Sequence, residues 1–280
     1  MADPVIIYPN SSPFHLVQAR HGWMLANKND FYLGGALLKY GEYAEQEFAL
    51  LAQIMFRPGC VLEVGANMGT HTISLAKLLA GNNRRLIAFE PQPFVFHNLC
   101  GNLALNGLSN VRAWPYACSD ETTTLYFDVP DYGSTVNTGG IAMRREGEEG
   151  RLAVPCVRLD DMEGTETVSL IKIDAEGFEL NVLRGAEHIL AQSRPVLYME
   201  NSDVEKSSEL IEWIWSKGYS LWWHTPSLFN PDNYFGVSEN LYPDLVSCNM
   251  LAIPAELSHP VSGLDAITDS HAHPFSFWSK

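Results

Sequence analysis

The stretch of sequence that most limits the fold predicts a strand, a glycine turn and a helix in direct succession. Residues 61–64 form a short strand-like run, Gly65 and Gly69 lie in the turn, and apolar residues at helical spacing continue to Ala80. Glycine lets the backbone come close to a ligand, and the first amides of the helix point at that ligand. The stretch therefore predicts a cradle for a nucleotide-like ligand.

Three side chains indicate which kind of nucleotide the cradle binds. Dinucleotide-binding turns have a second glycine where this chain has Asn67, so the backbone cannot approach a pyrophosphate as closely. Glu63 adds a negative charge before the turn, and Glu90 ends the next strand, where an acid can accept both ribose hydroxyls. This pattern favours a nucleoside without phosphates and is typical of S-adenosylmethionine sites. The alternative interpretation is that the turn is one found in any α/β protein and binds no ligand, and that Glu90 is an acid at the end of a strand that only increases solubility.

Strands and helices alternate through most of the chain, which predicts an α/β fold with a doubly wound, mostly parallel sheet. We expect residues 1–42 to form an N-terminal cap or hairpin, residues 43–254 the main domain, and residues 255–280 an irregular tail. In the cap, residues 17–26 and 31–37 are predicted strands joined by a turn. In the domain, the predicted strands are 61–64, 86–89, 111–118, 122–129, 154–159, 168–174, 195–199, 219–224 and 247–253. The predicted helices are 43–56, 70–80, 93–106, one that follows Gly177 and carries Leu180 to Leu190, and one that carries Leu210, Ile211 and Ile214 and stops at Gly218.

Polar residues end several of the predicted strands. These polar strand ends are residues 63–69, Glu90, Ser119 with Asp120, Asp174 and Glu200. Ligands of doubly wound sheets bind outside the carboxyl ends of the strands, near the point where strand order reverses. We therefore expect these residues to share one rim of the sheet.

Composition limits the partners and the compartment. The net charge of −15 disfavours a nucleic-acid backbone or an anionic membrane surface as partner. No apolar run approaches the roughly 18 residues of a membrane span, and Asp3 lies where a signal peptide would be basic. Five cysteines without close pairs fit reduced thiols better than disulfides. These features predict a cytoplasmic protein.

Four blocks of the sequence resemble the FkbM family of S-adenosylmethionine-dependent methyltransferases. The blocks are residues 61–69, 89–91, 118–120 and 170–179, the last reading Leu-Ile-Lys-Ile-Asp-Ala-Glu-Gly-Phe-Glu, and their order and spacing cover residues 20–253. The resemblance implies a Rossmann-like class I methyltransferase fold. It also implies methylation, most often of a hydroxyl oxygen, on acceptors such as sugars, glycans or polyketide-type natural products.

The resemblance also assigns cofactor contacts residue by residue. It implies that Glu63, Gly65, Asn67 and Gly69 hold the methionine side, with the backbone at Thr70 and Thr72 meeting the methionine carboxylate, Glu90 binding the ribose, Ser119 and Asp120 lying at the adenine edge, and Asp174 lying beneath the methionine amine. His71 remains unassigned.

Methylation of an alcohol requires a base within hydrogen-bond reach of its proton. The candidates are Asp174, Glu176, Glu200 and His224. His224 has an ordinary pKa near neutrality, although a structural histidine at a strand end is the alternative. Glu176 could instead favour the start of the following helix. The predicted acceptor contacts, all asparagines in polar loops, are Asn137, Asn230 and Asn233.

Oxygen ligands at two neighbouring strand ends raise the question of a metal. Asp174, Glu200 and Asn201 would suit Mg²⁺ rather than Zn²⁺. Carboxylates at adjacent strand ends are also common without a metal, so the predicted site includes none.

Three other functions are weighed against this one. Asn67 speaks against a nicotinamide-dependent oxidoreductase, and the run from Asp174 to Gly177 lacks the Pro-Pro-aromatic turn of nucleic-acid amine methyltransferases. A non-catalytic regulator that binds a nucleoside or a glycan could keep the cradle and lose the base. Some of the tryptophans of residues 213–223 would serve the core or subunit contacts, which leaves a homo-oligomer open.

Overall fold

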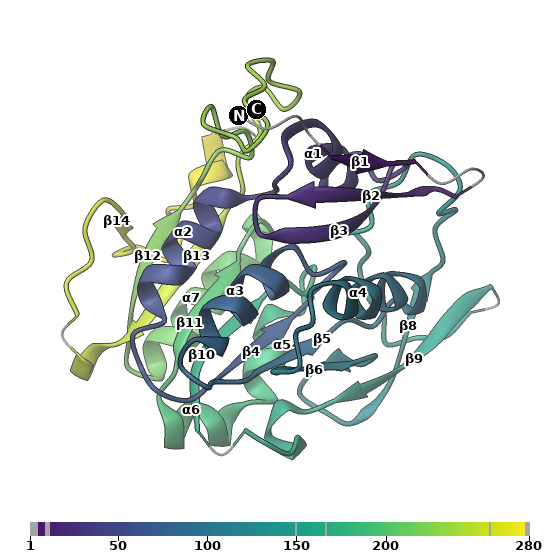
Figure 1. Cartoon of the computed structure of the whole chain (residues 1–280). Coiled ribbons are helices and arrows are strands. Elements are labelled where there is room, and N and C mark those ends of the chain that lie inside the picture. The colour runs from purple at the N-terminus through teal and green to yellow at the C-terminus, as the bar shows by residue number, and fades with distance from the viewer. Residues whose placement is uncertain (1–4, 9–11, 149, 166, 258, 278–280) are drawn as a thin grey trace.

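The computed structural model describes residues 5–8, 12–148, 150–165, 167–257 and 259–277. Residues 1–4, which bear on the predicted compartment, lie outside this range. An eight-stranded sheet crosses the molecule in the order β14-β12-β13-β11-β10-β4-β5-β6 (Figure 1). Its strands are β4 (Cys60–Val64), β5 (Leu86–Phe89), β6 (Val111–Trp114), β10 (Val168–Ile173), β11 (Val196–Glu200), β12 (Tyr219–His224), β13 (Asn249–Pro254) and β14 (Asp265–Ala266).

The central sheet is mostly parallel, as predicted. The five strands from β11 to β6 pair in parallel, whereas β13 pairs antiparallel with both β11 and β12. From β4 the chain moves outward to β5 and β6 and then crosses to β10 on the other side. Strand order therefore reverses between β4 and β10, which is where ligands of such sheets bind.

Helices cover both faces of the sheet and bury two cores (Figure 1). Successive strand residues point to opposite faces, so Leu62 joins the core beneath α5, α6 and α7, and Val61 joins the core beneath α2, α3 and α4. The helices are α2 (Glu45–Ile54), α3 (Thr70–Ala80), α4 (Pro93–Leu105), α5 (Glu179–Arg184), α6 (Glu187–Ser193) and α7 (Val204–Ser216).

The N-terminal hairpin exists, but its turn is not where the sequence predicted it. Strands β2 (Phe14–Ala19) and β3 (Gly22–Asn27) meet at residues 20–21, and β1 (Ile6–Ile7) pairs with β2. Residues 31–37, predicted as a strand, instead lead into helix α1 (Leu33–Tyr40). The helix forms there because Oδ1 of the buried Asp30 accepts the Leu33 amide at 2.8 Å.

Two further predicted elements are divided in the structure. The strand predicted at residues 111–118 splits into β6 and β7 (Ala117–Cys118), and β7 joins β8 (Thr123–Asp128) and β9 (Arg151–Val157) in a separate sheet. The helix predicted after Gly177 splits into α5 and α6 at Gly185. A Cβ atom on Gly185 would lie 2.0 Å from the Ser119 carbonyl oxygen, so the backbone segments touch there.

Residues after β13 return to the body of the protein. They form short 3-10 turns and β14, which pairs with β12, and they bury Ile267 and His273. The Nε2 atom of the buried His273 lies 2.8 Å from the Asn201 carbonyl oxygen. Throughout the described part of the chain, every helix is too short or too polar to cross a bilayer.

Candidate functional site

A cavity of about 290 Å³ lies over the carboxyl ends of β4, β5, β10 and β11, at the reversal of strand order. The structure brings most of the predicted site residues to its wall. These are Glu63, Gly65, Asn67, Thr70, Glu90, Asn137, Asp174, Glu176 and Glu200. Most of the polar strand ends expected from the sequence to share one rim therefore surround one space, whereas Gly69, Ser119 and Asp120 do not line it.

The glycine turn is packed against the strand beside it. Gly65 has a φ of +78°, and a Cβ atom there would lie 1.8 Å from the Asp174 carbonyl oxygen. Only glycine fits both the left-handed backbone and this close approach. The turn thus places Asp174, at the end of β10, directly beside the start of α3.

Glu90 is held rigidly at the edge of the cavity. Its Oε2 accepts the Asn67 amide and its Oε1 accepts the Gln92 amide, both at 2.9 Å. Burial raises the pKa of Glu90 to about 7, against the lowering effect of these two amides. Each oxygen keeps a free lone pair, so the carboxylate can accept two further donors such as a pair of ribose hydroxyls.

A buried acid and a buried lysine lie side by side beneath the turn. Glu63 on β4 is paired in register with Lys172 on β10, and it accepts the Thr72 hydroxyl at 2.7 Å. Burial raises the pKa of Glu63 to about 7, which Lys172 and Thr72 partly offset. Lys172 is only 3% exposed, and its Nζ lies 3.5 Å from Oδ2 of Asp174.

Lys172 was not among the site residues predicted from the sequence, although it lies two residues before Asp174 in the predicted strand. Residues two apart on a strand share a face, so Lys172 had to face the same side as Asp174. Gln92, two residues after Glu90, was also missed; both residues line the cavity. A lysine inside an otherwise apolar strand, two residues before the predicted site residue Asp174, is the sequence signal that indicates a role for Lys172.

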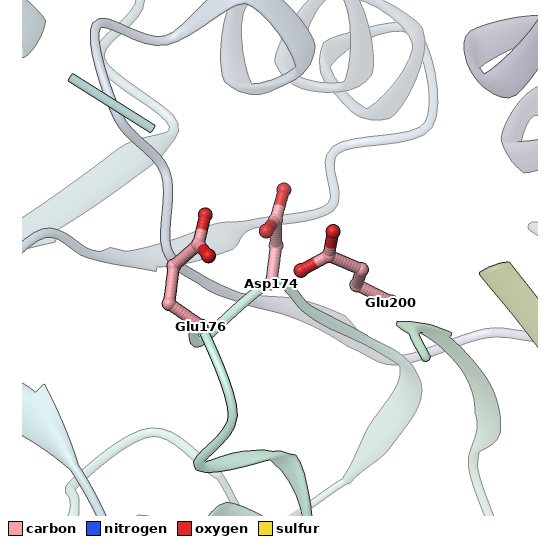
Figure 2. A group of neighbouring side chains, drawn as sticks. All are labelled: Asp174, Glu176 and Glu200. Carbon is pink, nitrogen blue, oxygen red and sulfur yellow. The ribbon is translucent and has the colours of Figure 1, made fainter. Parts of the chain in front are cut away.

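Three carboxylates converge at the ends of β10 and β11 (Figure 2). One oxygen each of Asp174, Glu176 and Glu200 lies within 4.8 Å of the others. Burial raises the pKa of Glu176 to about 8 and that of Glu200 to about 9, and the charge of Asp174 adds to both shifts. All three atoms are oxygens, so this carboxylate cluster suits a hard cation rather than zinc.

His71 lines the cavity, and one of its ring nitrogens has no hydrogen-bond partner among the described residues. The side chain is 6% exposed, and this nitrogen is the buried Nε2. Burial, with a further effect of Lys172, lowers the pKa of His71 to about 3, even though a hydrogen bond to the Ala44 backbone opposes the shift. His71 is therefore neutral near pH 7.

The polar loop after β8 forms one wall of the cavity. Its residues 137–141 line the space, and Gln92 donates to the Thr138 carbonyl oxygen at 2.8 Å. Tyr132 in turn donates to Gln92 at 3.1 Å. The predicted contact Asn137 accepts the backbone amides of Gly139 and Gly140, so its oxygen shapes the loop.

Four of the predicted cofactor contacts do not line the cavity. Gly69 begins α3 with a φ of +92°, and the Thr72 hydroxyl is taken by Glu63. Ser119 is buried and donates to Asp120, which pairs with Arg145 at 2.5 Å. The wall on that side consists instead of residues 116–118.

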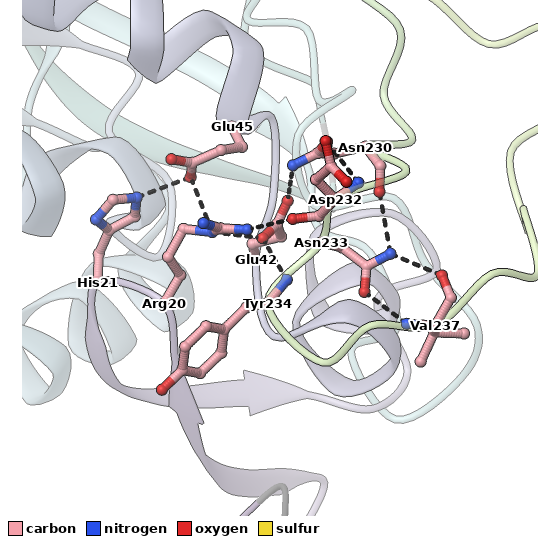
Figure 3. Close-up of polar contacts among 9 residues, drawn as sticks. All are labelled: Arg20, His21, Glu42, Glu45, Asn230, Asp232, Asn233, Tyr234 and Val237. Atoms are coloured by element: carbon pink, nitrogen blue, oxygen red, sulfur yellow. Dashed lines mark hydrogen bonds and ion pairs between the residues drawn. The ribbon is translucent and has the colours of Figure 1, made fainter. Parts of the chain in front are cut away.

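Three of the predicted acceptor-side residues also lie outside the wall of the cavity. Asn230 donates to Glu42 at 2.8 Å, and Asn233 holds the Val237 backbone, so both asparagines brace their own loop (Figure 3). His224 pairs with the Tyr198 hydroxyl at 2.9 Å, and burial lowers the pKa of His224 to about 4. These three side chains therefore stabilise the fold and do not line the cavity.

Comparisons with known proteins fit this arrangement. Residues 63–221 match the family described as the Methyltransferase FkbM domain. Methyltransferase sdnD of Sordaria araneosa is 31% identical over 157 residues, and the match covers 45% of this chain and 60% of that protein. Methyltransferase 1 of Beauveria bassiana (strain ARSEF 2860) is 26% identical over 195 residues, covering 61% of this chain and 76% of that protein.

One of the solved structures that this chain matches is Methyltransferase FkbM from Methylobacillus flagellatus KT. It is 18% identical with a TM-score of 0.45, and the alignment covers 70% of this chain and 45% of that one.

Proposed function

The chain belongs to the FkbM methyltransferase family, and we propose that it uses S-adenosylmethionine to methylate a hydroxyl oxygen of a small molecule, sugar, glycan or natural product. One observation carries the proposal. A single cavity joins the glycine turn, Glu90 and the carboxylate cluster at the reversal of strand order. A nucleoside site and a proton acceptor thus share one space.

The cofactor half of the cavity fits a nucleoside that bears an amino acid. Glu90 would bind the ribose hydroxyls, because its two fixed oxygens each keep a lone pair. Gly65, Asn67 and the first amides of α3 would hold the methionine end. Asp174 would hold the methionine amine, and residues 116–118 would border the adenine.

The acceptor half of the cavity supplies orientation and a place for a proton. S-adenosylmethionine supplies a methyl group already activated on its sulfonium, so the protein mainly positions the acceptor oxygen. We propose that Glu200 or Glu176, in its ionised form, takes the hydroxyl proton while the oxygen bonds to the methyl carbon and the carbon–sulfur bond breaks, which leaves S-adenosylhomocysteine. Both carboxyls line the cavity, which His224 does not.

Apolar and aromatic side chains in the wall of the same cavity favour an organic acceptor. Tyr32, Leu228, Leu245 and Phe275 line the cavity together with Glu200. A mixed apolar and acidic wall suits a hydroxylated acceptor with an apolar face, such as a sugar ring or a glycosylated natural product.

Calorimetric titration of the purified protein with S-adenosylhomocysteine, S-adenosylmethionine and NAD tests the proposal. We expect binding of the first two at micromolar concentration and none of NAD. Methyl transfer to a panel of glycosides and their per-O-methylated counterparts then tests the reaction, since only the free hydroxyls should accept. Binding of NAD alone would refute the methyltransferase assignment, and cofactor binding without transfer to any hydroxyl would favour a regulator.

A further inference from the structure

The three carboxyls of the carboxylate cluster, Asp174, Glu176 and Glu200, can ionise together only if a bound cation neutralises them. Lys172 is the nearest cation, 3.5 Å from Asp174, and it is the only lysine or arginine in the described wall of the cavity. Three carboxylates and one ammonium leave two negative charges when all are ionised. Buried carboxylates without a counter-charge are unfavourable, so the cluster is complementary to a ligand of charge +2.

Asn249 is a second and separate sign of a ligand at the same place. It lies directly opposite Glu200 in the pairing of β11 with β13, so both side chains share one face of the sheet. Asn249 is 5% exposed and lines the cavity. Its side chain acts as a hydrogen-bond donor to the Glu47 carboxyl and lowers the pKa of Glu47, but the amide nitrogen has two N–H groups, and among the described residues no acceptor lies at full hydrogen-bond distance from it. Such a donor calls for an oxygen atom from a ligand.

We propose that Asp174, Glu176 and Glu200 bind Mg²⁺, which holds one hydroxyl of the acceptor, while Asn249 donates to a neighbouring oxygen of the same acceptor. The acceptor class is then a compound with two adjacent oxygens, such as a vicinal diol. The proposal rests on the proposed function for the identity of the acceptor, but the metal site stands on the geometry of these side chains alone.

The chemistry of the cluster favours Mg²⁺ over softer metals. Its donors are carboxylate oxygens from two strand ends and the turn that follows β10, with no thiol or imidazole among them. Mg²⁺ is usually held by one or two carboxylates and keeps several waters, which an acceptor hydroxyl can replace. The hydroxyl proton would pass to a carboxylate oxygen that the ion does not bind, and the acceptor oxygen would bond to the methyl carbon as the carbon–sulfur bond breaks and S-adenosylhomocysteine leaves.

Binding of Mn²⁺, a paramagnetic stand-in for Mg²⁺, tests the site without cofactor or acceptor. Loss of the free Mn²⁺ signal in electron paramagnetic resonance should report one site per chain, and excess Mg²⁺ should release the ion. We expect Glu176→Gln and Glu200→Gln each to weaken binding at least tenfold. The matched control is Glu163→Gln, an exposed acid in the loop before β10, at the other end of that strand. It should leave binding unchanged.

A gain of affinity provides a test that impaired folding cannot mimic. Asn249→Asp adds a carboxylate beside Glu200, so Mn²⁺ should bind at least threefold more tightly. Equal binding in all five proteins, or none in the unaltered one, would overturn the metal site. S-adenosylhomocysteine titrated in parallel separates the two proposals, since cofactor binding without Mn²⁺ binding removes only this one, and Mn²⁺ binding without cofactor binding removes only the proposed function.

Discussion

Thr138 donates both its backbone amide and its hydroxyl to Oδ2 of Asp30, a residue 108 positions earlier in the chain. The other oxygen of Asp30 accepts the Leu33 amide at the start of α1. One fully buried carboxylate therefore joins the loop that lines the cavity to the N-terminal helix. This link holds the wall of the site to a segment far away in sequence.

Replacement of Asp30 by Asn should destabilise the protein. The new amide nitrogen cannot accept from Thr138, so buried donors lose their partner, at a cost of about 2–3 kcal/mol in the free energy of unfolding. Urea denaturation measures the effect. Asp131→Asn is the control, because Asp131 is exposed and accepts the Gly133 amide within a local turn that asparagine also forms. Equal destabilisation by both would contradict the role given to Asp30.

Gly65→Ala should damage the cradle far more than Gly107→Ala. Both glycines have positive φ, +78° and +63°, so both variants share a backbone strain of about 1 kcal/mol. Only Gly65 also lies against backbone, because its Cβ would meet the Asp174 carbonyl, whereas Gly107 has no atom within 4 Å of the Cβ position. We expect Gly65→Ala to lower stability by at least about 2 kcal/mol more and to abolish binding of S-adenosylhomocysteine. Similar melting curves for the two variants would argue against the close approach.

Glu90→Gln should weaken binding of S-adenosylhomocysteine by about 10- to 100-fold, the range expected when hydrogen bonds to a charged acceptor are lost. The folded state should also lose about 1–3 kcal/mol, because the new amide nitrogen cannot accept from one of the two backbone amides that Glu90 binds, although removal of a buried carboxyl whose ionised form is disfavoured offsets part of this cost. Calorimetry and thermal denaturation of the same samples measure both quantities. A variant that binds the cofactor normally would show that Glu90 does not hold the ribose.

The raised pKa of Glu90, about 7, sets a pH dependence with a definite sign. The protonated form is favoured in the folded protein, so this group's contribution to stability is present below its ordinary pKa of 4.5 and is lost as pH rises through 7. Cofactor binding should show the opposite trend, because ribose hydroxyls donate to the ionised carboxylate. Affinity for S-adenosylhomocysteine should therefore rise from pH 6 to pH 8.

Another group near Glu90 titrates in the same range, so a difference measurement is required. The group concerned is Glu63, whose pKa burial raises to about 7 and whose charge acts on Glu90, whereas Tyr132 faces Glu90 in its neutral form, since burial raises the pKa of that phenol to about 12. The pH profile of the unaltered protein minus that of Glu90→Gln isolates the contribution of Glu90. Identical profiles would assign the titration to its neighbours.

Glu200→Gln and His224→Gln should differ in turnover. Glu200 lines the cavity, so its replacement should lower kcat by about 100-fold or more, the contribution typical of proton transfer. His224 is turned toward Tyr198, so its replacement should change kcat less than about threefold, within the loss of one hydrogen bond. Affinity for S-adenosylhomocysteine, measured alongside, should stay within twofold in both. A larger loss in His224→Gln would restore that histidine as the base.

The order of the main elements could be predicted from the sequence, and the reason is local. Apolar spacing of 2 or 3.6 residues, together with glycines that permit left-handed backbone, predicted β4, the turn at Gly65 and α3. The same reasoning failed at residues 31–37, because α1 begins at a cap from Asp30 whose other oxygen is held by Thr138. A helix start that depends on a distant partner leaves no periodic signal.

By itself, the sequence determined the α/β alternation, the rim of polar strand ends and the glycine cradle, since backbone conformation and strand polarity follow from neighbouring residues. Only the tertiary structure decided which polar side chains face the cavity. In the folded protein, Lys172 and Thr138 line the cavity, whereas Asp120 pairs with Arg145 and Asn230 donates to Glu42. These side-chain orientations depend on hydrogen bonds and ion pairs between segments far apart in the sequence. Such contacts become strong only after packing has brought the segments together and excluded water.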